Sequence, residues 1–190
     1  MLGTTQLSDD FRDPVLAERL LTTLQQRLVE GRTYRLMEFC GGHTHALCQS
    51  GLLDRLPAAV QMIPGPGCPV CVLPLGRLQQ AIDLAVSGQV ILCGYGDMLR
   101  VPGRGRQSLL LARSTGADVR VVYGTAEALQ VARAHPQRQV VFLAVGFETT
   151  TPMTAAIVAQ ARAEGLHNFS ILCNHVLTPA ALRGLLATTE

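Results

Sequence analysis

The sequence predicts an α/β fold in which parallel sheets are flanked by helices, built from Rossmann-like βα units. Short apolar runs of strand length alternate with segments whose apolar residues recur at helical spacing. After one leading helix this order repeats six times, which is typical of parallel strands covered on both faces. Stretches that are rich in glycine or contain cysteine follow the predicted strands, so we expect the sites at the carboxyl ends of the strands.

The elements follow from local signals. The leading helix begins at Pro14, because Asp13 is a good N-cap residue and proline suits the first helical position, and Gly31 is expected to end it. The predicted strands are the short apolar runs 34–39, 60–63, 90–93, 119–122, 139–145 and 168–173. The predicted helices are the intervening periodic segments 44–50, 75–87, 108–115, 125–134, 152–164 and 179–187.

Two domains are expected, with a boundary near Gly124, where the fourth predicted strand ends. Residues 1–124 would form an α/β domain that contains the loops of Cys40 and of Cys68 and Cys71. Residues 125–190 would begin a second α/β domain, which we expect to be incomplete because two strands are too few for an independent one.

Composition excludes several classes of function. Sixteen basic and fourteen acidic residues give a net charge of +2, and aromatic residues make up only 4%, so nucleic-acid binding is not expected. No run of uninterrupted apolar residues is long enough to span a bilayer. The N-terminus has no basic start and no apolar stretch of the signal-peptide kind. We therefore expect a cytoplasmic protein, in which six cysteines favour metal or redox chemistry over structural disulfides.

The first candidate site is the run Cys-Gly-Gly-His-Thr-His that starts at Cys40. Gly41 and Gly42 permit a tight turn from a strand into a helix, and a helix N-terminus favours the thiolate of a cysteine. His43 and His45 are close enough in sequence to act as base, donor or second ligand. The alternative is a buried structural cysteine in a tight turn with surface histidines.

The second candidate site is the C-x-x-C pair of Cys68 and Cys71, in a loop stiffened by prolines. This spacing allows the two sulfurs to form a disulfide or to share a metal. Two alternatives stay open: a thiol-disulfide oxidoreductase without iron, and a structural zinc domain in which Cys40 and one histidine complete the ligands. Three further cysteines are interpreted as structural, namely Cys48, Cys93 and Cys173.

Asp97 and Glu148 each place a carboxylate just after a predicted strand. Such a carboxylate can orient a histidine or accept N–H groups at a helix start, and simple capping is the alternative. Arg100 belongs to a small basic loop with Arg104 and Arg106, which we interpret as solvated rather than as an anion site.

Four segments together resemble the HypD family of hydrogenase formation proteins: 37–45, 65–72, 94–103 and 146–152. The resemblance implies a scaffold that assembles the Fe(CN)2CO group of [NiFe] hydrogenases, with a HypC-like small chaperone and a HypE-like cyanide donor as partners. It implies that Cys40 is the iron-binding thiolate with His43 beside it, and that Cys68 and Cys71 are a redox pair. Gly41, Gly42, His45, Asp97 and Glu148 are then expected to surround the bound group.

The family also implies a [4Fe-4S] cluster, carried on cysteines in a C-terminal part that this chain lacks. Releasing cyanide from a protein-bound thiocyanate takes two electrons, and a dithiol that becomes a disulfide supplies two. Because the strands 34–39 and 60–63 are consecutive and joined by a short helix, we expect them to be parallel neighbours. The Cys40 loop and the Cys68/Cys71 loop would then face each other across one cleft.

Overall fold

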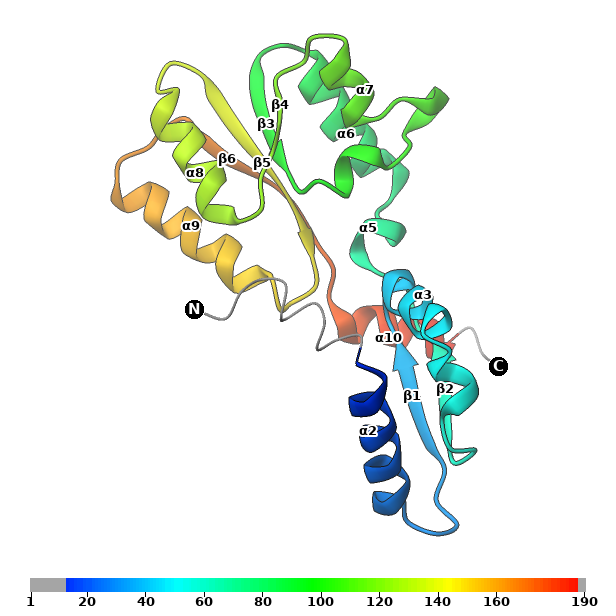
Figure 1. The fold of residues 1–190 in the computed structure, drawn as a ribbon. Helices are drawn as coiled ribbons and strands as arrows, with labels where there is room; N and C mark the ends of the chain where they lie inside the picture. Colours follow the sequence, from blue (N-terminus) through cyan, green and yellow to red (C-terminus); the bar gives the residue numbers. More distant parts are fainter. Residues whose placement is uncertain (1–12, 188–190) are drawn as a thin grey trace. The chain divides into compact units, whose positions relative to one another are not determined.

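A computed structural model describes residues 13–187 of the protein (Figure 1). The chain divides into two compact units, of which the first ends at Gly67 and the second begins at Cys68. The first contains a two-stranded sheet and the second a four-stranded sheet, and all strand pairs in both are parallel. The predicted α/β class with parallel sheets flanked by helices is confirmed.

The first unit opens with helix α2 (Pro14–Arg27). Asp13 caps it as predicted, since its Oδ1 accepts the N–H groups of Val15 at 2.8 Å and Leu16 at 3.2 Å. The helix ends at Arg27, earlier than expected. Gly31 lies beyond this end, at φ +74°, in the turn that leads into the first strand.

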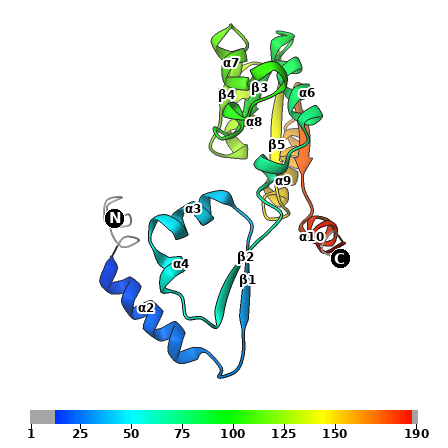
Figure 2. The same cartoon turned by 90° about the vertical axis from the view of Figure 1, so that its right-hand side faces the viewer.

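Strands β1 (Tyr34–Glu38) and β2 (Val60–Pro64) pair in parallel, with Glu38 opposite Pro64 at their carboxyl ends. Helices α3 (Gly41–Gln49) and α4 (Leu52–Arg55) connect them. Figure 2 shows α2, α3 and α4 on the same side of the two strands. Among the described residues of this unit only Val60 is buried, so its core is small and covers one face of the sheet.

The second unit is built on a sheet with strand order β4-β3-β5-β6. Its strands are β3 (Val90–Gly94), β4 (Val119–Val121), β5 (Gln139–Gly146) and β6 (Phe169–His175). Its α-helices are α5 (Pro69–Val72), α6 (Leu75–Val86), α7 (Leu109–Ser114), α8 (Thr125–Ala134), α9 (Thr151–Ala163) and α10 (Thr178–Ala187). Two short 3-10 helices, Met98–Arg100 and Arg104–Arg106, follow β3.

Successive residues of β3 point to opposite faces of this sheet and enter two separate cores. Leu92 packs in the cluster that contains residues of α6 and α7, whereas Ile91 and Cys93 pack in the cluster that contains residues of α8 and α9. Both faces of the larger sheet are therefore covered, as the continuous apolar strands predicted. None of the helices among residues 13–187 is long and apolar enough to cross a bilayer.

The division between the units does not fall at the expected boundary near Gly124. Strand β3 pairs with β4 on one side and with β5 on the other, so a single sheet runs across that position. The break lies instead at Gly67 and Cys68, where the chain leaves the small sheet. The Cys40 loop and the Cys68/Cys71 loop consequently belong to different units, not to one domain of residues 1–124.

Candidate functional site

Cys40 is the N-cap residue of α3, directly after β1, with an extended backbone at φ −135° and ψ 121°. Its carbonyl oxygen accepts the N–H groups of His43 at 2.9 Å and Thr44 at 3.1 Å. The residue is only partly buried. A Cβ at Gly42 would lie 3.6 Å from the Cys40 sulfur, an ordinary contact distance, so the glycine leaves that side of the sulfur open.

Glu38 organises this turn, and the sequence reasoning did not select it. Its Oε1 accepts the backbone N–H of Cys40 and lies 3.3 Å from Nδ1 of His43. The Glu38 side chain is 14% exposed, whereas that of His43 is 75% exposed. The sequence signals for Glu38 were its position near the end of the predicted strand 34–39 and its place in the segment 37–45 that carries the family resemblance. His45, which was predicted to lie near the site, is exposed on α3.

The end of β1 is in close contact with the chain that leaves β2. The N–H of Gly65 donates to the Glu38 carbonyl at 2.8 Å, and a Cβ at Gly65 would lie 2.5 Å from that same oxygen. Only glycine fits such an approach. The expected parallel pairing of these neighbouring strands is thus observed, and their following loops leave from one edge. The cleft between the two cysteine loops stays a prediction.

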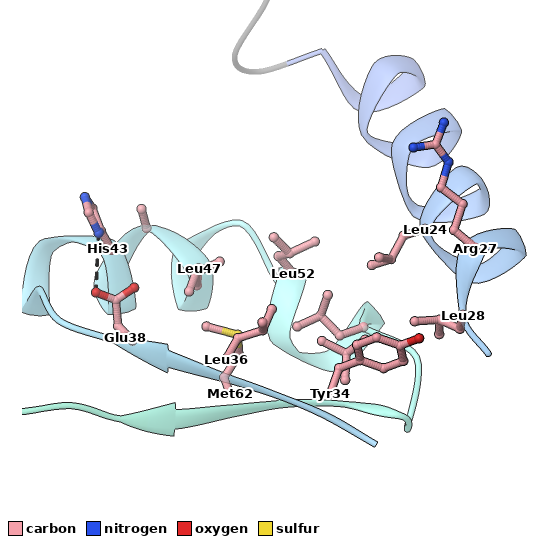
Figure 3. Close-up of a pocket in the computed structure, with 13 residues that line it drawn as sticks. Leu24, Arg27, Leu28, Tyr34, Leu36, Glu38, His43, Leu47, Leu52 and Met62 are labelled. Atoms are coloured by element: carbon pink, nitrogen blue, oxygen red, sulfur yellow. Dashed lines mark ion pairs between the residues drawn. The ribbon is translucent and has the colours of Figure 1, made fainter. Parts of the chain in front are cut away.

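An apolar cavity of about 670 Å³ lies under α2, α3 and α4, above the strands β1 and β2. Figure 3 shows the Glu38–His43 pair at one end of this cavity and α2 residues at the other. Most lining side chains are apolar, and they include Leu24, Leu28, Leu36, Leu47, Leu52 and Met62. The small unit therefore presents an apolar hollow that Glu38 and His43, on either side of Cys40 in the sequence, help to line.

The second candidate site lies at the start of the larger unit. Cys68 is the N-cap residue of α5, and its sulfur accepts the backbone N–H of Cys71 at 3.3 Å. The two sulfur atoms lie 2.9 Å apart. Cys68 is partly buried and Cys71 is exposed. The pair needs little movement to form a disulfide, and one of its sulfurs is accessible to a reactant.

Asp97 lies on the cavity that Cys71 also lines. Its Oδ1 accepts the N–H of Met98 at 2.8 Å, so it also has the capping role that was the alternative interpretation. The carboxylate does not contact a histidine in the described part of the chain.

Glu148 links the loops that follow β5 and β6. Its carboxylate accepts the Thr178 hydroxyl at 2.6 Å and also the backbone N–H of Thr178, at the start of α10. The Thr178 hydroxyl is the main cause that lowers the pKa of Glu148. Nearby, His175 contacts the hydroxyl of Thr154 at 3.0 Å and not this carboxylate. Of the two roles expected for Glu148, the structure contains the acceptance of N–H groups at a helix start.

The remaining cysteines differ in exposure. Cys93 is fully buried, and burial raises the pKa of its thiol to about 11. Cys48 and Cys173 are exposed. Within residues 13–187, which include every cysteine, no three His, Cys, Asp or Glu side chains gather closely enough to hold a metal ion. These residues therefore do not fit a [4Fe-4S] cluster, which needs four thiolates or their equivalents.

Comparison with known proteins gives a consistent result. The HypD family model, described as "Hydrogenase formation hypA family", matches residues 15–190. The hydrogenase maturation factor HypD of Azotobacter vinelandii is 58% identical over 182 residues, which make up 96% of this chain and 48% of that protein. The hydrogenase maturation factor HypD of Cupriavidus necator is 52% identical with the same coverage, and that of Escherichia coli is 45% identical over 183 residues. The chain spans about half the length of these relatives.

Proposed function

The chain belongs to the HypD family of hydrogenase formation proteins, and from this premise we propose that it acts in hydrogenase maturation as a scaffold for the Fe(CN)2CO group. The iron is cargo in this proposal, held while its ligands are attached. The observation that carries the proposal is the position of Cys40, a partly exposed thiol at the start of α3 with Glu38 and His43 beside it.

Cys40 would bind the iron through its thiolate. A low-spin iron that carries CO and cyanide suits a soft sulfur ligand. Since no group of three or more His, Cys, Asp or Glu side chains that could hold a metal ion occurs within residues 13–187, Cys40 would supply one ligand. The other positions would be filled by the diatomic ligands and by a partner. Gly41 and Gly42 would leave room for that group, with His45 near its outer side.

His43 would serve as the proton carrier at this thiol. Its Nδ1 faces the Glu38 carboxylate at 3.3 Å, which favours the tautomer that carries the proton on Nδ1. The Nε2 atom would then be left as an acceptor toward solvent, where it can take the proton of the Cys40 thiol as iron binds. Glu38 acts through His43 and the Cys40 backbone, and is therefore a positioning residue.

The pair of Cys68 and Cys71 would supply the electrons that release cyanide. A thiocyanate on a HypE-like donor accepts two electrons, its S–C bond breaks, and a donor thiolate and a cyanide ion result. The two thiols lose two electrons and two protons and become a disulfide, so the step balances. The 2.9 Å separation of the two sulfurs supports this role.

The proposed partners and location also rest on membership of the HypD family. A HypC-like small chaperone would complete the iron coordination and a HypE-like protein would deliver cyanide, in the cytoplasm. Asp97 would contribute beside Cys71, and Glu148 would hold the two loops that precede α9 and α10. We assign no electron transfer to a [4Fe-4S] cluster, because the described residues do not fit one.

A thiol-disulfide oxidoreductase without iron is the second candidate, and the contact between the Cys68 and Cys71 sulfurs favours it as well. The two candidates differ in whether Cys40 is needed. The chain should be isolated without oxygen from cells that also express a HypC-like partner. Iron content and infrared bands of CO and cyanide are then compared for the parent and two variants.

Cys40→Ala is expected to lose the iron and the infrared bands. Cys48→Ala is the matched control, because Cys48 is an exposed cysteine near the other end of the same helix. Iron and infrared bands that persist in Cys40→Ala would refute the scaffold assignment. Bands absent from the parent and from both variants, with a Cys68–Cys71 pair that oxidises reversibly, would favour the oxidoreductase.

A further inference from the structure

Another cavity, which lies in the larger unit, is beside the C-x-x-C pair of Cys68 and Cys71. Cys71, Asp97 and Arg100 line one cavity of about 490 Å³. The other side chains that line it are apolar, and they are Val70, Leu73, Leu75, Leu78, Val101 and Pro102. Binding sites for small molecules in proteins have about 300–1,000 Å³ and combine mostly apolar walls with a few polar groups. This recess has that character, with one thiol, one carboxylate and one guanidinium.

Asp97 and Arg100 are both exposed, and within residues 13–187 neither charge is paired with another side chain. Within residues 13–187 the Arg100 guanidinium has no ion-pair or hydrogen-bond partner, and Asp97 uses one oxygen for the Met98 N–H. Some arginines elsewhere in this unit are paired with carboxylates, as Arg120 is with Asp118 and Arg133 with Glu164. A ligand with both a carboxylate and an ammonium group would complement both unpaired charges.

We propose that this cavity binds a small zwitterionic thiol of the cysteine class, which reduces the Cys68–Cys71 disulfide. The ligand's carboxylate pairs with Arg100, its ammonium pairs with Asp97, and its sulfur meets Cys71. This inference rests on the redox role proposed above for the pair. It gives the chain a source of electrons that uses its own described residues.

The order of the exchange follows from the different surroundings of the two cysteines. Cys71 is exposed, whereas Cys68 is partly buried and accepts the Cys71 N–H. The ligand thiolate therefore attacks the sulfur of Cys71, the bond between the two cysteines breaks, and Cys68 leaves as a thiolate that this N–H stabilises. The product is a mixed disulfide between Cys71 and the ligand.

A second ligand thiolate then attacks the ligand sulfur of that mixed disulfide and releases Cys71. Two ligand thiols lose two electrons and two protons and become one ligand disulfide. The pair gains the two electrons, and the two protons restore both thiols, so the exchange balances.

The test uses the full chain, oxidised with diamide, and four thiols. L-Cysteine carries both charges, cysteamine only the ammonium, 3-mercaptopropionate only the carboxylate, and 2-mercaptoethanol neither. Each rate is corrected for the thiolate present and divided by the rate on a Cys-Pro-Val-Cys peptide disulfide. We expect L-cysteine to exceed 2-mercaptoethanol by about fivefold in the chain, the size expected for exposed charge pairs, with the other two thiols between them.

Arg100→Gln and Asp97→Asn are each expected to remove much of this advantage. Arg104→Gln is the matched control, since Arg104 is exposed in the same basic loop but does not line the cavity. Asparagine keeps an oxygen for the Met98 N–H, and circular dichroism checks the fold of each variant. Mass spectrometry after an acid quench should locate L-cysteine on Cys71.

An advantage that is unchanged in Arg100→Gln, or an adduct that forms on Cys68, would overturn the inference. If the chain forms the Cys68–Cys71 disulfide but the four thiols reduce it at the same relative rates as they reduce the peptide disulfide, this binding site is refuted and the redox role is not. A chain in which diamide never joins the two cysteines would refute the redox role itself, and this inference with it.

Discussion

Glu38 and His43 lie 3.3 Å apart, Oε1 to Nδ1, across the turn at Cys40, and the same carboxylate oxygen also accepts the Cys40 N–H. One partly buried carboxylate thus fixes both the backbone of the candidate iron ligand and the ring beside it. The strand places Glu38, and the start of α3 places the other two residues. The geometry of this turn therefore depends on a residue that binds nothing in the proposed chemistry.

We expect Glu38→Ala to lower the free energy of unfolding of the first unit by about 1–3 kcal/mol, because the Cys40 N–H loses a charged acceptor. Glu38→Gln should cost less, since its amide oxygen can still accept that N–H. Urea unfolding followed by circular dichroism measures both. Glu30→Ala is the control, because Glu30 is exposed in the loop after α2 and should change little. Equal losses for Glu38→Ala and Glu30→Ala would contradict the role given to Glu38.

Gly65→Ala is expected to destabilise the first unit by about 1–3 kcal/mol, the usual cost of forcing an extra carbon into a packed site. The added Cβ would lie 2.5 Å from the backbone oxygen of Glu38, which cannot rotate away. Gly76→Ala provides the contrast, since it lies in α6 with nothing within 4 Å of an added Cβ. That change should stabilise by up to about 1 kcal/mol. Chemical denaturation measures the free energy of unfolding of both variants. An unchanged stability of Gly65→Ala would show that the end of β1 and the chain after β2 can move apart without cost.

The contact between Glu148 and Thr178 should make the start of α10 sensitive to acid. Hydrogen bonds to the carboxylate hold the folded pKa of Glu148 below its usual range. Their contribution is therefore fully present above the usual glutamate pKa and is lost as the pH falls through the lowered folded value. Hydrogen exchange at the α10 amides, followed from neutral pH into this acid range, should report the loss. Glu148→Gln should show weaker protection at neutral pH and a flatter pH profile, while an unchanged profile would refute the coupling.

Alkylation should separate the cysteines by burial. The thiolate is the reactive form, and burial raises the pKa of Cys93 to about 11, so this thiol should resist iodoacetamide at pH 8 in the folded chain. Cys48 and Cys173 are exposed and should react. Peptide mapping by mass spectrometry measures the alkylation rates of all three cysteines, and these rates should become equal in denaturant. A Cys93 that reacts as fast as Cys48 without denaturant would show that the larger core opens readily.

The sequence predicted most of the fold because the strands carry a strong local signal. Strand β5 (Gln139–Gly146) is apolar along nearly its whole length and was expected at 139–145, and Asp13 and Pro14 set the start of α2 as expected. The first turn of α3 was missed, since Gly41 and Gly42 have low helix propensity, and the helix was expected to begin at residue 44. In the structure, hydrogen bonds from residues 43 and 44 to the Cys40 carbonyl form that turn.

The candidate site was predictable only where its residues share a short motif. Cys40 and the pair at Cys68 and Cys71 were selected from local motifs, and the family resemblance implied their iron and redox roles. The role of Glu38 depends on side-chain direction at the end of a strand, and the cavity that Cys71 and Arg100 both line depends on how α5 and the loop after β3 pack. The first depends on side-chain direction and the second on the packing of segments far apart in sequence, and periodicity encodes neither.

Because the first unit has a small core, binding at its Cys40 thiol should change the folding stability of the unit. Because only Val60 is buried among its described residues, this unit has little apolar burial to hold it together. Any cargo or partner that binds its folded form alone adds directly to its stability. If Cys40 holds cargo as proposed, loading would then be readable as resistance to proteolysis, with the empty form the more readily degraded of the two.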